Sequence, residues 1–352
     1  MPLIKHKKTS MEIEILAQSK ITEQILGAYV QNNETNIDVP TRIKSVILVA
    51  SGSSFHCARY IADLFGTIGQ IDARAIYSSE FLLKPLVEHD SGLLYVFISQ
   101  SGETTDTNSA LERAKGLGVT TLCITNNENS TILDKSDYHI FCHAGVEKSI
   151  AATKSLTSQM LCAILLVLKL SQNKGVDISS YLRDLNDIPD IISQTYKIRP
   201  KIKQMARFLS KYRSIVMCAD GASYAFAKEA SLKIKETSYI NTCSYILGEF
   251  MHGHVAVLNN SKCAVIFVSN DVLSYTEIKD LNIIKENYKP PICVIGTKTN
   301  QVKSTYNIDI ECSKPMVKSF AILVMIQLLA LEIAIKLHRN VDKPHGLNKV
   351  VK

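Results

Sequence analysis

The chain reads LLYVFISQSGETTDT from Leu93 to Thr107. The first six residues form a continuous apolar run of the kind that buried parallel strands have. Small hydroxyl residues, an amide and a glycine follow, and a helix is predicted from Asn108 to Leu117. A strand, a polar turn and a helix make up the repeating unit of an open α/β sheet, so this stretch predicts that fold class.

The polar turn has the chemistry of a site for a phosphate or a similar oxyanion. Ligands of open α/β sheets bind at the carboxyl ends of the strands. Hydroxyl and backbone N–H groups donate hydrogen bonds there, and a helix N-terminus adds partial positive charge. An ordinary helix cap needs one hydroxyl, whereas this turn supplies Gln100 and five hydroxyls, those of Ser99, Ser101, Thr104, Thr105 and Thr107. We therefore favour an anion site over a simple capped turn.

Composition narrows the class of partner. The 352 residues are 46% hydrophobic and 21% charged, which is enough for two domains with full cores. A net charge of +7 suits an anionic small molecule. The basic cluster Lys5–Lys8 has no aromatic residues interleaved with it, so we expect no nucleic-acid partner. Polar residues interrupt the apolar stretch Phe320–Leu337, so we expect a core helix and no membrane span.

The cysteines indicate a reducing compartment. None of the nine forms a C-x-x-C pair, and five lie in or beside apolar runs, namely Cys123, Cys142, Cys218, Cys263 and Cys293. Such residues behave as small hydrophobes. The stretch Met1–Lys20 is polar and charged and has no signal-peptide pattern. We expect a cytoplasmic protein with reduced core thiols, no metal site and no cofactor.

Apolar runs alternate with amphipathic stretches along the whole chain, which predicts parallel sheets. Strands are expected in the first half at Ser45–Ala50, Ala73–Tyr77, Leu93–Ile98, Thr120–Thr125 and Tyr138–Cys142, with helices at Phe55–Thr67, Ser130–Lys135 and Thr153–Gln172. A helical connection, Asp187–Lys211, leads to strands at Ser214–Ala219, Cys263–Ser269, Ile292–Gly296 and Ile308–Cys312, and to a last helix at Met316–His338.

The two halves repeat each other. SVILVASGSSFHCA, from Ser45 to Ala58, matches SIVMCADGASYAFA, from Ser214 to Ala227, with Ser, Ala and Gly in register. A duplicated domain explains this match. The polar turn is not repeated, because FISQSG at Phe97–Gly102 corresponds to FVSNDV at Phe267–Val272. Asp271 would repel an anion and Val272 removes the glycine, so we expect a phosphate site only in the first half.

Six motifs in order then carry a resemblance to a known family. They are SGSS (51–54), SQSGET (99–104), EKSIAATK (147–154), EASLKIKE (229–236), GEFMHG (248–253) and DKPHGLNK (342–349). The chain resembles the tandem sugar isomerase (SIS) domains of glucosamine-6-phosphate synthase and the related glucosamine-6-phosphate deaminases. The resemblance covers nearly the whole chain, from about Met11 to Lys349. Two positions depart from it: His254 stands where the family usually has proline, and Asp220 where it often has arginine.

The resemblance implies an architecture. It implies an α/β fold of two tandem flavodoxin-like SIS domains, each a parallel sheet flanked by helices. The expected division is an N-terminal helical segment (1–30), a first, phosphate-binding domain (31–185), a second domain with the catalytic residues (186–340) and a tail closing over the site (341–352). It also implies a homodimer and, as ligand, a sugar 6-phosphate.

The resemblance also implies roles for single residues. Ser99, Gln100, Ser101 and Thr104 would bind the phosphate, and Ser54, Ile150 and Asn348 would line the sugar site. Glu236 would be the base that moves a proton between sugar carbons. His252 would open the sugar ring, reaching in from the neighbouring subunit. Lys349 would close over the sugar, and Glu229 and Lys233 would be supporting charges.

The residue chemistry supports these roles independently. Glu229, Lys233 and Glu236 are spaced by four and three, so they share one helix face. Two carboxylates beside an ammonium can be tuned so that one acts as a base. A histidine suits ring opening because its pKa lies near neutrality. The non-functional alternatives are that the helix face is a solvated set of ion pairs and that His252 is a loop residue with no catalytic role.

Several reactions share these requirements. Pro2 follows Met1 and the first cysteine is Cys57, so we expect no glutamine hydrolysis by this chain. The leading hypothesis is an amino-sugar-6-phosphate deaminase and isomerase that converts glucosamine 6-phosphate to fructose 6-phosphate and ammonia. The alternatives are the isomerase part of an aminotransferase-like system and a fructosamine-6-phosphate deglycase. A non-enzymatic alternative is a sugar-phosphate sensor.

Overall fold

A computed structural model describes residues 8–32, 34–84, 92–259 and 262–350. The first domain has five parallel strands, β3 (Ser45–Ala50), β4 (Asp72–Tyr77), β5 (Leu93–Ser99), β6 (Thr120–Thr125) and β7 (Tyr138–Phe141). Its helices are α3 (Gly52–Gly69), α4 (Ser78–Leu83), α5 (Thr105–Gly116), α6 (Thr131–Lys135) and α7 (Lys154–Asn173). The strands lie in the order β4-β3-β5-β6-β7.

The second domain repeats this arrangement with β8 (Ser214–Ala219), β9 (Asn241–Ile246), β10 (Cys263–Val272), β11 (Ile292–Thr297) and β12 (Tyr306–Asp309). Its helices are α11 (Tyr224–Ser238), α12 (Leu247–Met251), α13 (Tyr275–Tyr288) and α14 (Pro315–Lys336), with short 3-10 helices η1 (Gly221–Ser223), η2 (His254–Asn259) and η3 (Thr299–Gln301). The strand order is β9-β8-β10-β11-β12, so both sheets follow the doubly wound order 2-1-3-4-5. The predicted α/β duplication is confirmed.

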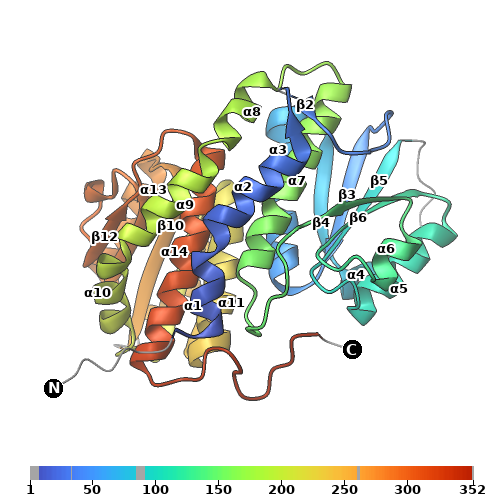
Figure 1. Cartoon of the computed structure of the whole chain (residues 1–352). Helices are drawn as coiled ribbons and strands as arrows, with labels where there is room; N and C mark the ends of the chain where they lie inside the picture. Colours follow the sequence, from blue (N-terminus) through green and yellow to red (C-terminus); the bar gives the residue numbers. More distant parts are fainter. Residues whose placement is uncertain (1–7, 33, 85–91, 260–261, 351–352) are drawn as a thin grey trace.

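The remaining helices join and flank the domains (Figure 1). The chain begins with α1 (Ser10–Leu16), α2 (Gln18–Tyr29) and a short hairpin of β1 (Val30–Gln31) and β2 (Glu34–Thr35). Between the domains run α8 (Ser179–Leu185), α9 (Ile188–Lys197) and α10 (Arg199–Leu209). Each of the last two starts with a proline in its first turn, which the missing N–H group allows. The connection expected at Asp187–Lys211 is therefore two helices.

Some element boundaries predicted from the sequence were wrong. β9 was not expected, because this edge strand is mostly exposed and its sequence, NTCSYI, has no apolar run. Helix α5 begins at Thr105, three residues before the predicted start, because polar residues fill its first turn. Strand β12 begins at Tyr306 and ends at Asp309, whereas the apolar pattern predicted Ile308–Cys312.

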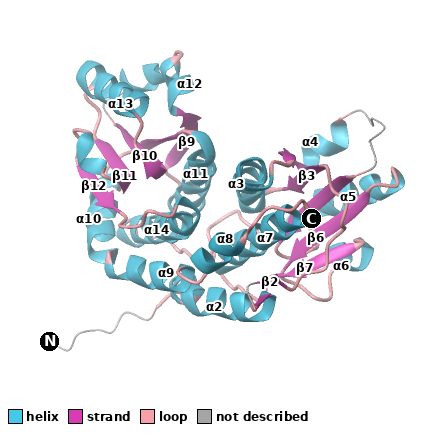
Figure 2. Cartoon of the chain, turned by 90° about the horizontal axis from the view of Figure 1, so that it is seen from above, coloured by secondary structure: helices cyan, strands magenta, loops and turns pink. Residues whose placement is uncertain are grey.

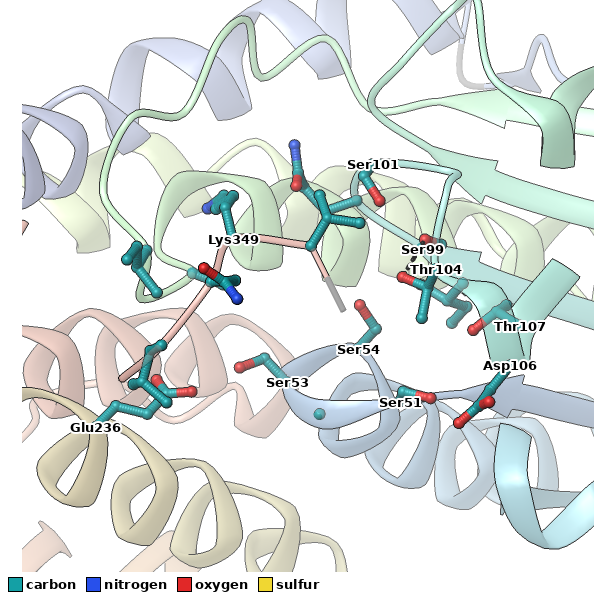
Figure 3. A pocket seen from close by; sticks show the side chains of 18 of the residues that line it. Ser51, Ser53, Ser54, Ser99, Ser101, Thr104, Asp106, Thr107, Glu236 and Lys349 are labelled. Carbon is teal, nitrogen blue, oxygen red and sulfur yellow. Dashed lines mark hydrogen bonds between the residues drawn. The ribbon is translucent and has the colours of Figure 1, made fainter. Parts of the chain in front are cut away.

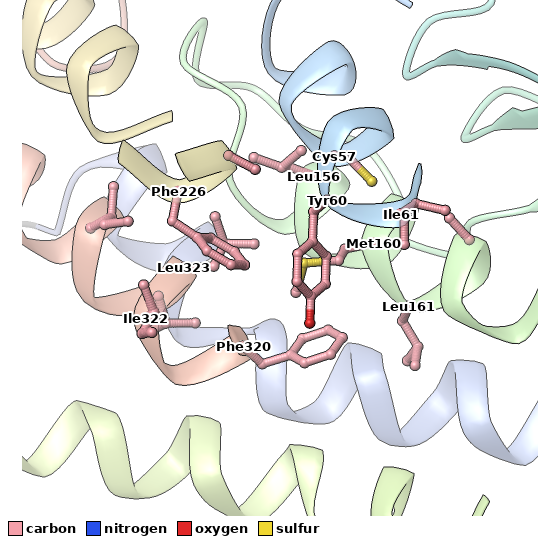
Figure 4. Close-up of a cluster of buried hydrophobic side chains, with 14 of the residues drawn as sticks. Cys57, Tyr60, Ile61, Leu156, Met160, Leu161, Phe226, Phe320, Ile322 and Leu323 are labelled. Atoms are coloured by element: carbon pink, nitrogen blue, oxygen red, sulfur yellow. The ribbon is translucent and has the colours of Figure 1, made fainter. Parts of the chain in front are cut away.

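One continuous core joins the two domains. Tyr60 on α3 and Phe226 on α11 have ring centroids 5.0 Å apart, and Leu156, Met160 and Leu323 are buried around them (Figure 4). Figure 2 shows the two sheets on opposite sides of helices that include α3, α7, α11 and α14. Ser53 and His56 at the start of α3 contact Glu229, whereas Tyr60, further along α3, packs on Phe226 near the start of α11, so the two helices run antiparallel. The carboxyl edge of the first sheet, where α3 begins, therefore lies beside the later turns of α11.

Helices α7 and α14 are long and apolar enough to span a membrane by length and composition alone. Their most apolar windows are 89% and 94% buried inside the structure, as in the central helices of a folded domain. The expected core helix at Phe320–Leu337 is thus found within α14. All nine cysteines lie in the described residues and are free thiols, and the five that were expected to be core thiols are buried.

Candidate active site

The candidate site begins where strands β3 and β5 end, side by side. Ala50 pairs with Ile98 in parallel register, so the turns that follow, Ser51–Ser54 and Ser99–Thr104, lie together. These two strands are where the strand order of the sheet reverses. A crevice for a ligand forms at such a point because the two connections leave toward opposite faces.

The Ser99–Thr104 turn is held by hydrogen bonds to its backbone, and the hydroxyls of Ser99 and Ser101 also accept from backbone N–H groups of the turn. The carbonyl oxygen of Gln100 accepts from the Asn126 N–H group, and that of Ser101 accepts from the Asn127 amide. The Ser99 hydroxyl accepts from the N–H group of Gly102 at 3.1 Å. Thr104 is the N-cap residue of α5, yet its side chain makes no capping hydrogen bond. The simple capped turn considered above therefore does not describe this turn.

Gly102 is required by the geometry of this turn. Its φ is +68°, in the left-handed region that disfavours other residues. A Cβ atom on it would lie 2.4 Å from the Cβ and Oγ atoms of Ser130. The tight approach lets Glu103 accept hydrogen bonds from the N–H group of Thr131 at 2.7 Å and from its hydroxyl at 3.0 Å. The turn is thus locked to the start of α6.

A cavity of about 680 Å³ opens above these turns (Figure 3). Ser99, Ser101 and Thr104 lie at one end of it, Glu236 lies at the other, and Lys349 lies beside it. The remaining walls come from the first turn of α3, the loop before α7 and the C-terminal segment. Its lining includes Ser51, Ser53, Ser54, Gln100, Asp106, Thr107, Ile150, Lys233 and Asn348. The cavity therefore joins elements of both domains.

The second domain lacks the equivalent turn. Strand β10 continues through Asp271 to Val272, which pairs with Thr297, where β5 has already ended. The Ser223 hydroxyl donates to the Asn270 side chain at 2.7 Å, and the N–H group of Asn270 donates back to Ser223 at 2.9 Å. These mutual hydrogen bonds use the hydroxyl that corresponds to Ser54.

Helix α11 supplies a buried charge network. The Lys233 Nζ atom donates to Glu236 at 2.5 Å and lies 3.6 Å from Glu229. The side chains of Lys233 and Glu229 are 1% and 2% exposed, whereas that of Glu236 is 23% exposed and lines the cavity. Burial lowers the pKa of Lys233, but the two carboxylates outweigh it and the net pKa is raised. Lys233 is thus a buried cation beside a carboxylate that faces the cavity.

Two residues of the first domain complete this network, and sequence reasoning missed both. The His56 Nδ1 atom lies 2.7 Å from Glu229, and the Ser53 hydroxyl donates to the same carboxylate at 3.1 Å. Both residues are on the first turns of α3. They stand in the quoted repeat stretch Ser45–Ala58, but only the packing of α3 on α11 shows that they meet Glu229.

The C-terminal segment closes one side of the cavity. The Lys349 Nζ atom pairs with Glu147 at 2.5 Å and donates to the carbonyl oxygen of Ser149 at 2.8 Å. Glu147 also accepts from the backbone and hydroxyl groups of Thr153 and Ser155. Burial would raise the pKa of Glu147, but the Lys349 ammonium and these hydrogen bonds lower it below its ordinary value. Lys349 is therefore held at the cavity by a buried anion.

His252 lies apart from the cavity of its own chain. It follows α12 at the C-cap position and is exposed, and it is not among the residues that line the cavity. His254 is also exposed, and its ring lies 4.5 Å from that of Tyr245. Asp220 accepts from the N–H group of Leu247 at 3.0 Å, so it holds the start of α12.

The structure thus brings most of the predicted site residues into one cavity. Ten of them line it, namely Ser54, Ser99, Gln100, Ser101, Thr104, Ile150, Lys233, Glu236, Asn348 and Lys349. Glu229 lies directly behind Lys233, while His252 lies elsewhere on the same chain. The Ser54 hydroxyl, predicted to line the sugar site, also donates to Gln159 at 3.0 Å.

The chain belongs to the SIS domain family, whose model matches residues 41–169 and again residues 208–336. A curated relative is the glutamine–fructose-6-phosphate aminotransferase (isomerizing) of Campylobacter jejuni, which is 29% identical over 97% of this chain. The chain spans 58% of the length of that relative. The tandem SIS assignment made from the six motifs is confirmed.

Solved structures of two other proteins have the same fold as this chain. The C-terminal domain of glucosamine-fructose-6-phosphate aminotransferase from Francisella tularensis superposes with a TM-score of 0.90 at 25% identity, covering 96% of this chain and 99% of that one. A glucosamine-6-phosphate deaminase from Thermotoga maritima superposes with a TM-score of 0.76 at 22% identity, covering 97% and 99%. The second likeness concerns the fold alone.

Proposed function

We propose that this protein is a phosphosugar enzyme that converts glucosamine 6-phosphate to fructose 6-phosphate and ammonia. The observation that carries the proposal is the cavity that has the Ser99–Thr104 turn at one end and Glu236 at the other (Figure 3). A phosphate held at the first end leaves the opposite end of an extended sugar chain beside the carboxylate. Hydroxyl groups, backbone amides and the N-terminus of α5 suit the phosphate.

Glu236 has the position of a general base. It reaches the cavity, and the buried Lys233 holds its carboxylate at 2.5 Å. In the proposed reaction Glu236 removes the proton from C2 of the open-chain amino sugar, and the resulting enaminol takes a proton back at C1. The product has a C2=N bond. Water then adds to C2, and ammonia leaves to give fructose 6-phosphate.

Ring opening must precede this step, and we assign it to His252 of a second copy of the chain. His252 is exposed and lies outside the cavity of its own chain. A partner histidine would need to reach the sugar end of the cavity, near Glu236. Lys349, whose ammonium already lies at the cavity wall, would close over the bound sugar.

The reverse reaction, ammonia-dependent formation of glucosamine 6-phosphate from fructose 6-phosphate, is the second candidate. The Campylobacter relative and the Francisella structure favour it, since both carry the aminotransferase name. Both directions use the same proton transfer at the same site, so the concentrations of ammonia and of the two sugar phosphates decide the net direction. A fructosamine-6-phosphate substrate would use the same phosphate anchor.

The proposal is tested by supplying glucosamine 6-phosphate, galactosamine 6-phosphate and fructosamine 6-phosphate separately and measuring ammonia and fructose 6-phosphate. We expect release of both products from glucosamine 6-phosphate. Fructose 6-phosphate with ammonium salts should give the reverse reaction. Clean interconversion of fructose and glucose 6-phosphates without ammonia release from any amino sugar would overturn the deaminase proposal. Binding of all sugars without turnover would favour the sensor alternative.

A further inference from the structure

The N-terminal helix α1 contacts two walls of the cavity. It lies outside both segments that match the SIS family model, as does the C-terminal segment from 337 onward. Figure 1 shows the chain running below α1 before it reaches the C-terminus. Two carboxylates make the contacts, one on the helix and one on the C-terminal segment.

Glu14 fixes the loop before α7. Its side chain is buried, with 5% of the residue exposed. The carboxylate accepts from the N–H group of Lys148 and from the hydroxyl of Ser149, each at 2.5 Å. Ser149 is the residue whose carbonyl oxygen accepts from Lys349, and Ile150, next in the chain, lines the cavity. Glu14 therefore shapes the surface on which Lys349 rests.

Asp342 fixes the C-terminal segment to the same helix. Its carboxylate accepts from the N–H groups of Ser10 and Met11, at 2.8 and 2.9 Å, which are the first two residues of α1. These N–H groups have no partner within the helix, and the helix dipole favours an anion there. The carbonyl oxygen of Asp342 also accepts from the N–H group of Ile150 at 3.1 Å.

A third contact holds the C-terminal segment from the catalytic helix. The N–H group of His345 donates to the Tyr239 hydroxyl at 2.7 Å, and Tyr239 is the C-cap residue of α11. Gly346, with φ +77°, follows at once and allows the chain to turn toward the cavity. Lys349 therefore lies only four residues beyond His345, on a segment anchored at Asp342 and His345.

We propose that Glu14 and Asp342 are positioning residues for the sugar-phosphate cavity, which they shape by holding the loop 147–152 and the segment 340–350 against the same helix. The expected effect on turnover rests on the proposed function, whereas the contacts of Glu14 and Asp342 are independent of it. Neither carboxylate lines the cavity. They act through Ser149, Ile150 and Lys349, so small displacements at α1 would misplace the ammonium group.

The test compares Glu14→Gln, Asp342→Ala and the conservative Asp342→Asn in the full chain. Matched controls are Ile13→Ala, an exposed residue of the same helix, and Lys343→Ala, the exposed neighbour of Asp342. Amide hydrogen exchange of the segment 345–350 is measured first. Within the described chain, the Glu14 carboxylate accepts hydrogen bonds from Lys148 and Ser149 and none from the segment 345–350. Faster exchange of that segment in Glu14→Gln would therefore show that the effect passes through the loop before α7. We expect at least about tenfold faster exchange.

Kinetic measurements distinguish a positioning role of Glu14 and Asp342 from a general effect on folding. We expect kcat/KM for the sugar phosphate to fall about tenfold or more in Glu14→Gln and Asp342→Ala. Asp342→Asn should be intermediate because one amide oxygen can still accept. The dissociation constant of inorganic phosphate, which probes the Ser99–Thr104 turn alone, should change less than about twofold.

Two results would overturn the inference. One is folded variants whose segment exchange and kcat/KM both stay within about twofold of the unaltered protein. The other is loss of phosphate binding in proportion to turnover, which would show a general loss of fold. If the unaltered protein turns over no sugar phosphate, the proposed function fails, while hydrogen exchange and phosphate binding still decide the role of α1.

Discussion

The imidazole Nδ1 atom of His56 lies 2.7 Å from the Glu229 carboxylate, joining α3 of the first domain to α11 of the second. Both side chains are nearly inaccessible, 9% and 2% exposed. Glu229 in turn lies 3.6 Å from Lys233, which donates to Glu236 at 2.5 Å. A chain of contacts thus runs from His56 of the first domain through Glu229 and Lys233 to Glu236.

Replacing His56 should therefore affect both stability and turnover. In His56→Ala the buried Glu229 carboxylate loses a partner, and we expect the free energy of unfolding to fall by about 1.5–3 kcal/mol. Glu229 would then draw Lys233 away from Glu236, so kcat should fall. Denaturant unfolding and steady-state kinetics measure the two effects, and His56→Gln, which keeps a donor, should recover part of each. Unchanged kcat in a stable His56→Ala would show that the network does not reach Glu236.

Glu236→Gln should separate binding from chemistry. The amide keeps nearly the shape of the carboxylate but cannot take the C2 proton, so we expect kcat to fall by about 10²–10⁴. The Ser99–Thr104 turn, the proposed phosphate site at the other end of the cavity, is untouched, so inorganic phosphate should bind as before. Lys235→Gln, an exposed change on the same helix, is the control. Normal turnover by Glu236→Gln would exclude Glu236 as the base.

Gly102→Ala tests the phosphate anchor against a matched glycine. Gly102 and Gly118 both have φ +68°, but a Cβ atom at Gly118 meets nothing within 4 Å, whereas at Gly102 it lies 2.4 Å from Ser130. Gly118→Ala should cost about 1–2 kcal/mol of stability through backbone strain alone. Gly102→Ala should cost more and should also weaken inorganic phosphate binding, measured by calorimetry. Equal effects of the two variants would argue against a tightly built anchor.

The pairing of Lys349 with Glu147 predicts how stability depends on pH. Burial opposes ionisation of Glu147, but Lys349 and the hydrogen bonds from Ser155 and Thr153 leave its folded pKa lowered. A carboxyl with a lowered folded pKa stabilises the fold above its unfolded pKa and loses that contribution as pH falls through the folded pKa. Removing the cation in Lys349→Met should raise the folded pKa of Glu147 toward its unfolded value, so the variant should be less stable at neutral pH and should lose less stability as the pH falls.

This is measured by thermal melts between about pH 3 and pH 7, the range that brackets ordinary carboxyl pKa values. Lys148→Met changes an exposed lysine of the same loop. Its melting temperature should depend on pH in the acid range as that of the unaltered protein does. If the melting temperatures of Lys349→Met and Lys148→Met changed equally with pH in the acid range, the assigned role of the Lys349–Glu147 ion pair would be contradicted.

The assignment of His252 to a partner subunit predicts complementation. His252→Asn and Glu236→Gln should each be nearly inactive alone. In a mixed dimer, one site receives an intact Glu236 from one chain and an intact His252 from the other. Random mixing should restore about 25% of the activity, because half the dimers are mixed and each has one intact site. Mixtures as inactive as either variant would contradict the assignment of His252 to the site of the partner subunit.

The sequence alone determined the fold class, the duplication and the chemistry of the polar turn. Each depends on local pattern: apolar runs such as Leu93–Ile98, the match of Ser45–Ala58 with Ser214–Ala227, and the glycine at 102. Edge strand β9 was not predicted, because its exposed and buried residues do not alternate regularly. The spacing of Glu229, Lys233 and Glu236 placed them on one helix face, where the structure has them.

Only the tertiary structure decided which distant groups meet. His56 and Ser53 reach Glu229 because α3 packs on α11, and Glu14 reaches Ser149 because α1 lies under the loop before α7. Asp342 caps a helix 331 residues away along the chain. Periodicity reports the face on which a side chain lies, but a hydrogen bond needs a second atom within about 3 Å, and that partner is chosen by the packing of whole helices.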